Sequence, residues 1–93
     1  MTTLTVTGEV TKQCPYKDER DDGTATLTFE VGDGDGPELH GLSSYLSTFR
    51  GVPLSHEAFT RALLADYDCV EVVTRWSTAG LEVECRAVSD RRE

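Results

Sequence analysis

Two segments near the start of the chain alternate between apolar and polar residues, which is the pattern of half-buried β-strands. In residues 2–11 one face carries threonine and glutamate, and the other carries Leu4, Val6 and Val10. In residues 24–31 the apolar positions are Ala25, Leu27, Phe29 and Val31. Residues 12–23, between these segments, are polar and rich in turn-forming residues, so we expect an irregular connection there.

The middle of the chain repeats its apolar residues every three or four positions, which is typical of amphipathic helices. After a glycine-rich loop, Pro37 suits the first position of a helix. The apolar stripe of this helix comprises Leu39, Leu42, Leu46 and Phe49. Ser55 is the expected N-cap of a second helix that runs to about Tyr67, and Leu54 and Phe59 have the spacing of a hydrophobic staple around that cap.

Two further strands are predicted at residues 69–76 and 81–88, with a turn at residues 77–80 and a polar tail at residues 89–93. The resulting order is β-β-α-α-β-β. It predicts one α+β domain over residues 1–93, in which a four-stranded antiparallel sheet carries two helices on one face. Such a sheet leaves two edges and one face uncovered, and in a chain this small we expect self-association to relieve that exposure.

The composition is that of an acidic globular protein. The chain has 17 Asp and Glu against 9 Lys and Arg, a net charge of −8, and its lysines are Lys12 and Lys17. We expect a cytoplasmic protein, because no run approaches the roughly 18 apolar residues of a membrane span and no secretory signal is visible. An acid-rich, lysine-poor surface is typical of a salty, halophilic cytoplasm, although an ordinary acidic protein shares this balance. At low salt the charge disfavours a broad polyanion-binding face.

The three cysteines are Cys14, Cys69 and Cys85. An odd number without a CxxC pair favours free thiols in a reducing cytosol, and scattered cysteines with two distant histidines do not readily supply a zinc site. Cys69 and Cys85 fall on alternating strand patterns, where a small buried hydrophobic residue is the simplest interpretation. Cys14 lies in the polar connection beside several carboxylates, and its setting is consistent with either a packed or a functional thiol.

Four other polar candidates have simple structural interpretations when each is taken alone. Asp21 is one of several acids in a polar segment, where solvation is the expected state. Glu38 and Glu57 open the two predicted helices, where a carboxylate complements the helix dipole. His56, beside Glu57, is compatible with a solvated surface position.

In combination, however, these residues resemble the QueF family, whose enzymes act on the nitrile of 7-cyano-7-deazaguanine. The family has a Cys-Pro with an aspartate seven residues later, a helix that begins with Glu-Leu or Glu-Ser, a Tyr-x-x-Ser-Phe-Arg segment and a Phe-His-Glu motif. The corresponding residues here are Cys14-Pro15, Asp21, Glu38-Leu39, the run from Tyr45 to Phe49-Arg50 and His56-Glu57. Thr48 stands where the family segment has serine, and Ser55 stands where it has phenylalanine. The resemblance spans about residues 13–63.

The resemblance implies a tunnelling-fold (T-fold) unit that assembles into ring-shaped homo-oligomers. It also implies a mechanism. Cys14 would add its thiolate to the nitrile carbon and form a thioimidate. Asp21 would protonate the nitrile nitrogen, and His56 would line the pocket near that nitrogen.

The resemblance further implies how the base is held. Glu57 would accept hydrogen bonds from the guanine-like edge of the base. Glu38 and Leu39 would line the base pocket across a subunit boundary.

One departure from the family bears on the cofactor. The family's reductases bind NADPH through a motif with two lysines, and here His40 and Ser43 stand in those positions. The chain therefore resembles more closely the short archaeal QueF-like amidinotransferases, which need no cofactor. They use ammonia to convert the nitrile, already inserted in tRNA, into the formamidine of archaeosine. The alternatives are an NADPH-dependent reductase of the free base and a non-catalytic, purine-binding T-fold assembly protein.

Overall fold

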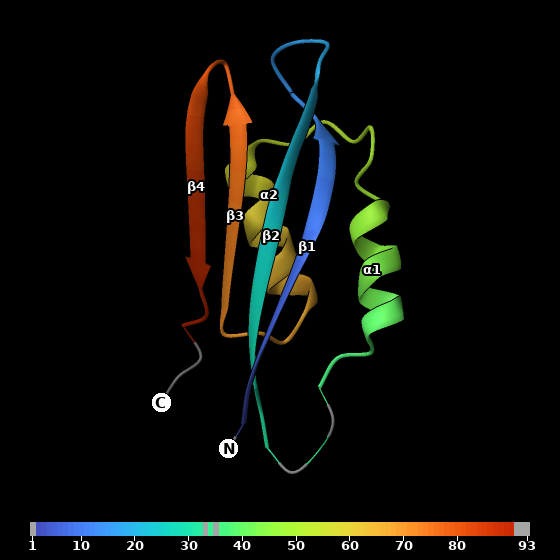
Figure 1. The fold of residues 1–93 in the computed structure, drawn as a ribbon, viewed down its shortest axis with the longest axis vertical. Coiled ribbons are helices and arrows are strands. Elements are labelled where there is room, and N and C mark those ends of the chain that lie inside the picture. Colours follow the sequence, from blue (N-terminus) through green and yellow to red (C-terminus); the bar gives the residue numbers. More distant parts are fainter. Residues whose placement is uncertain (1, 33, 35, 91–93) are drawn as a thin grey trace.

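The computed structural model describes residues 2–32, 34 and 36–90. Its elements, in chain order, are β1 (Thr2–Gln13), β2 (Arg20–Val31), α1 (Leu39–Ser47), α2 (His56–Asp66), β3 (Glu71–Thr78) and β4 (Leu81–Val88) (Figure 1). The strands form one sheet in the order β1-β2-β3-β4, and each neighbouring pair is antiparallel. The predicted α+β architecture is confirmed. The predicted tail and glycine-rich loop lie partly outside the described residues.

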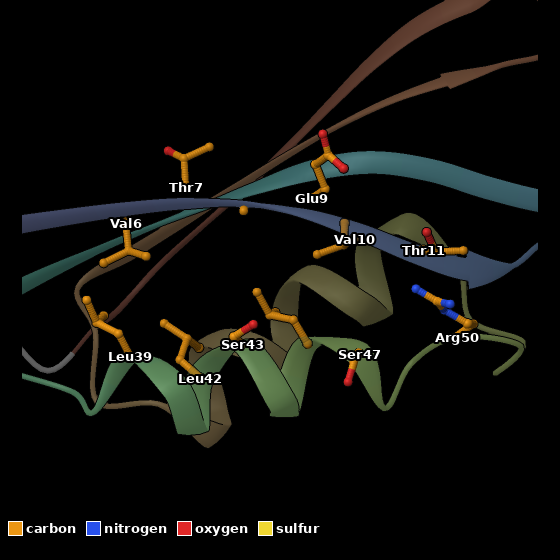
Figure 2. A pocket seen from close by; sticks show the side chains of 12 residues that line it. Val6, Thr7, Glu9, Val10, Thr11, Leu39, Leu42, Ser43, Ser47 and Arg50 are labelled. Atoms are coloured by element: carbon orange, nitrogen blue, oxygen red, sulfur yellow. The ribbon is translucent and has the colours of Figure 1, made fainter.

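Both helices lie on one face of the sheet, and the core fills the space between the two layers (Figures 1 and 2). Helix α2 packs on β3 and β4, whereas α1 lies along β1. The fully or nearly buried apolar side chains include Val10, Ala25, Leu27, Phe29, Leu42, Leu46, Phe59, Leu63, Val72 and Trp76. The inward faces predicted for the first two strands and both helices are therefore confirmed, except at Leu39, which is 53% exposed. Among the described residues, no helix is long and apolar enough to cross a bilayer.

The polar connection predicted at residues 12–23 is much shorter in the structure. Strand β1 continues to Gln13 and β2 begins at Arg20, so the loop covers only residues 14–19. The ladder pairs Lys12 with Asp21 and Gln13 with Arg20. Polar residues extend the strands here because the backbone ladder is satisfied and opposite charges face each other across it.

Three other predicted boundaries are wrong by a few residues. Helix α1 begins at Leu39 rather than at Pro37, because the side chain of Glu38 caps it. Strand β3 begins at Glu71 rather than at residue 69. The turn before β4 is tighter than expected, because Ala79 and Gly80 both take positive φ values, of 56° and 77°. That conformation closes a two-residue hairpin and lets β3 run on to Thr78.

The edge strand β4 is less covered than its sequence pattern suggested. Leu81, in the same alternating row as Cys85, is 65% exposed. Cys69 is buried as expected, but Cys85 is only partly buried, which corrects its assignment to the core. The reason is geometric: β4 is the last strand of the sheet, so its inward row has a neighbouring strand on one side only.

Candidate active site

Cys14 lies at the end of the sheet where the chain also begins its second helix. Its backbone N–H donates to the carbonyl of Glu19 at 2.9 Å, which closes the loop after β1. Just before it, Gln13 pairs with the connection between the helices, donating to the carbonyl of Val52 at 3.0 Å and accepting from the N–H of Leu54 at 3.2 Å. These bonds bring the first turn of α2 to the same end of the molecule as Cys14 (Figure 1).

The same end holds a buried ion pair between β1 and β2. The ammonium of Lys12 lies 2.7 Å from Oδ2 of Asp21, and the two side chains are 0% and 3% exposed. Asp21 is therefore not a solvated surface acid, the interpretation it had when taken alone.

His56, the first residue of α2, stacks on the indole of Trp76 with ring centroids 4.7 Å apart and 12° between the ring planes. Its Nε2 lies 3.1 Å from the hydroxyl of Thr78. Its Nδ1 is buried and has no hydrogen-bond partner among the described residues. Burial, followed by the charge of Lys12, lowers the pKa of His56, against smaller opposing effects of Asp21 and Glu57. The ring is thus held neutral, which leaves one nitrogen as an acceptor.

A chain of hydrogen bonds fixes Trp76 beneath this histidine. The indole N–H donates to the hydroxyl of Thr74 at 2.9 Å, and the hydroxyls of Thr74 and Thr60 lie 2.6 Å apart. The Thr60 hydroxyl in turn donates to the carbonyl of His56 at 2.8 Å. On the neighbouring strand, a Cβ built at Gly23 would lie 2.7 Å from the Trp76 ring. The glycine therefore makes the space that the indole occupies.

The predicted base-binding residues divide between the two ends of the molecule. Glu57 is exposed in the first turn of α2, beside His56. Glu38 and Leu39 lie at the start of α1, at the opposite end of the sheet (Figure 1). The Glu38 carboxylate accepts hydrogen bonds from the N–H groups of His40 and Gly41, at 3.0 and 2.7 Å. Within one chain, Cys14, Asp21, His56 and Glu57 thus lie at one end of the sheet, whereas Glu38 and Leu39 lie at the other.

A groove of about 390 Å³ runs between β1 and α1 (Figure 2). Leu39 and Leu42 point from the helix toward Val6 and Val10 of the strand, and Arg50 lies at the far end of the groove. Leu39 is 53% exposed, so this apolar wall is open to a partner or ligand. The groove borders β1, which has a neighbouring strand on only one side.

The cysteines differ in their suitability as nucleophiles. Burial raises the pKa of the Cys69 thiol, which disfavours the reactive thiolate. Cys14 is partly exposed and follows Lys12 by two residues in the sequence. In the described ranges, no three His, Cys, Asp or Glu side chains gather in a metal-binding arrangement. The groups that do converge suit addition of a thiol to a polarised carbon, with a carboxylate to carry the proton.

Sequence reasoning missed Lys12, Trp76, Thr60 and Thr74 as parts of this site. A signal for Lys12 was present, because it stands two residues after the inward-facing Val10 and so continues the buried row of β1. For Trp76 and the two threonines the pattern gave only their place on a strand or helix. Their roles depend on contacts between α2 and β3.

The chain shares its fold with a protein of known structure. No family model matches its sequence, and no curated protein matches it either. Among solved structures it is similar to the archaeosine synthase QueF-Like, whose crystal structure is of the apo form. The TM-score is 0.85, the match covers 98% of this chain and 96% of that chain, and 18% of the residues are identical. At this identity the likeness establishes the fold, and with it the expected T-fold unit.

Proposed function

We propose that this chain is a QueF-like amidinotransferase, which adds ammonia to the nitrile of a 7-cyano-7-deazaguanine base in tRNA to form archaeosine. The observation that carries the proposal is that one end of the sheet holds Cys14 directly after β1, the buried Asp21 on β2 and His56 at the start of α2. The fold of an archaeosine synthase supports the same assignment. The substrate class comes from that likeness and from the spacing of the sequence motifs.

The reaction has two additions, and both balance without a redox cofactor. In the first, the Cys14 S–H bond breaks and its proton passes to Asp21, the sulfur bonds to the nitrile carbon as one π bond of the nitrile breaks, and Asp21 delivers the proton to the nitrogen. In the second, ammonia adds to the thioimidate carbon and the Cys14 thiol is released. The product is a formamidine, which contains the nitrile plus one ammonia.

The remaining candidate residues bind the base. Glu57 accepts from the guanine-like edge, and His56 lines the pocket near the nitrile nitrogen. Glu38 and Leu39 complete the base pocket from a neighbouring copy of the chain, because within one copy they lie at the other end of the sheet. The open edges at β1 and β4 are the surfaces through which copies associate into a ring.

Intact-mass spectrometry after incubation with 7-cyano-7-deazaguanine tests the first addition. We expect a covalent adduct on the wild type and none on a folded Cys14→Ala variant, with Cys69→Ala as the matched control. No adduct on the wild type, or an adduct that persists in Cys14→Ala, overturns the proposal. Absence of an adduct on the wild type would favour a non-catalytic purine-binding protein.

A second assay separates the transferase from the reductase. Ammonium with nitrile-bearing tRNA at high salt is expected to give the formamidine, detected by mass analysis of the digested tRNA. NADPH is expected to remain unoxidised, because His40 and Ser43 supply no lysine charge for its phosphates. NADPH oxidation that depends on the free base would identify the chain as a nitrile reductase instead.

A further inference from the structure

Lys12 is an unusual residue for the interior of a small acidic protein. Its side chain is 0% exposed, whereas the other lysine of the chain, Lys17, is exposed on the loop after β1. Burying an ammonium is unfavourable unless it is paired, and an apolar residue would fill the same space without that cost. The position of Lys12 therefore suggests a role other than packing.

Lys12 contacts two residues at this end of the sheet, Asp21 and Trp76, and its charge also acts on a third, His56. Its ammonium lies 2.7 Å from Asp21 and 4.7 Å from the centroid of the Trp76 ring. The opposite charge orients the carboxylate, and the cation over the indole adds an attraction that holds Trp76 in place. Through Trp76 the contact reaches His56, which stacks on the same indole.

We propose that Lys12 is a positioning residue of the thiol-addition step, which keeps Asp21 as an oriented carboxylate that exchanges a proton with the thiol of Cys14. This inference rests on the proposed function and assigns a residue that the sequence motifs do not include. Because Lys12 acts through Asp21, it does not itself contact the reacting atoms.

The proton balance of the step explains why a lysine is useful there. Paired with an ammonium, Asp21 starts without a proton and can accept the one that Cys14 must lose. The S–H bond breaks, the S–C bond forms, and the same proton passes from Asp21 to the nitrile nitrogen. Lys12 keeps its three protons throughout. A protonated Asp21 could give a proton to the nitrogen but would leave the thiol without a base.

A double-mutant cycle on adduct formation with the free base tests this role. The variants are Lys12→Met, Asp21→Asn and the double variant, and Lys17→Met is the matched control because it removes the same charge from an exposed lysine. We expect Lys12→Met to form the adduct at least about 10²-fold more slowly, with base affinity changed only a few-fold. In the Asp21→Asn background the same change should cause no further loss, because a residue that acts through Asp21 has nothing left to position.

Titration of the two histidines by NMR supplies a readout that does not depend on the reaction. Removal of the Lys12 charge should raise the pKa of His56, since that charge is among the causes that lower it. The exposed His40 should not respond, and Lys17→Met should leave both histidines unchanged. If Lys12→Met does not fold, the pKa of His56 is measured in the double variant, in which neither buried charge is left unpaired, and compared with that in Asp21→Asn.

The outcomes separate this inference from the proposed function. A wild type that forms no adduct overturns the proposed function and the inference with it. A wild type that reacts, together with a folded Lys12→Met that reacts at the same rate, overturns only the inference. The inference is also overturned if the rate losses of Lys12→Met and Asp21→Asn add in the double variant, or if the pKa of His56 does not change in Lys12→Met. Lys12 would then only fill space in the core.

Discussion

The imidazole of His56 lies nearly parallel to the indole of Trp76, at a centroid distance of 4.7 Å. This stack joins the first turn of α2 to the end of β3. A hydrogen bond between the hydroxyls of Thr60 and Thr74 joins the same two elements, and further hydrogen bonds link these threonines to His56 and Trp76. The first turn of a helix is prone to fraying, and here a rigid aromatic ring and a chain of three hydrogen bonds keep that turn in place.

Gly23→Ala is expected to destabilise the protein by disturbing that stack. The new Cβ would meet the carbonyl oxygen of Arg75 and lie 2.7 Å from the Trp76 ring, and neither group has room to move. We expect a loss of about 1–3 kcal/mol in the free energy of unfolding. The single tryptophan reports the change in fluorescence-monitored urea unfolding. The control is Gly32→Ala, where no atom lies within 4 Å of the added Cβ. Equal urea midpoints for the two variants would contradict the prediction.

Stability should fall as the pH drops below about 6.5 because of His56. Its pKa in the folded protein is lowered, first by burial and then by Lys12, from a value of 6.5 in the unfolded chain. Below that value the unfolded state binds a proton that the folded state resists, so the free energy of unfolding decreases. Above pH 6.5 His56 is neutral in both states, so the free energy of unfolding is not reduced by its protonation. Urea midpoints between pH 5 and 8 measure the slope. His56→Asn should flatten it and His40→Asn should not; identical slopes in all three proteins would refute the assignment.

Asp21→Asn and Glu57→Gln should separate proton transfer from base binding. Asp21→Asn is expected to slow adduct formation by roughly 10²–10⁴-fold with little change in base affinity, since a group that moves a proton acts in the transition state. Glu57→Gln is expected to weaken base binding and to change the rate at saturation much less. Rates and dissociation constants come from mass-monitored time courses over a range of base concentrations. The same binding defect in both variants, without a rate defect, would show that the roles are wrong.

The native assembly should become more stable as salt is added. Two sheet edges need partners, while a net charge of −8 on each copy repels across any interface until counterions screen it. We expect sedimentation to show a closed homo-oligomer in molar salt and dissociation as salt is removed. A monomer in molar salt would exclude a base pocket completed by Glu38 and Leu39 of a neighbouring copy.

Local patterns were sufficient to predict most of the fold. Alternation located the inward row of β2, and the cap at Ser55 was confirmed by the hydrogen bond from the N–H of Ala58 to its hydroxyl, at 3.0 Å. The burial of Asp21 could not be predicted in this way, because its partner Lys12 lies nine residues earlier and faces it only through the register of the hairpin. Polarity by itself assigns both residues to solvent.

The site, too, could be predicted only in part, because its layout depends on the three-dimensional path of the chain. The motif spacing identified Cys14, Asp21, His56 and Glu57, which the structure brings to one end. It carried no information on where α1 begins relative to them. Because α1 follows the far end of β2, Glu38 lies at the opposite end of the sheet, and only the three-dimensional path of the chain reveals this.

The direction of the outer strands determines at which end of the sheet a support or a fusion partner is linked. Strand β1 starts at Thr2, which pairs with Val31, and β4 finishes at Val88, which pairs with Glu71. Both of these positions lie at the end of the sheet away from Cys14 (Figure 1). A bead, a sensor surface or a fluorescent fusion partner linked beyond either strand would therefore be tethered on the side away from the thiol.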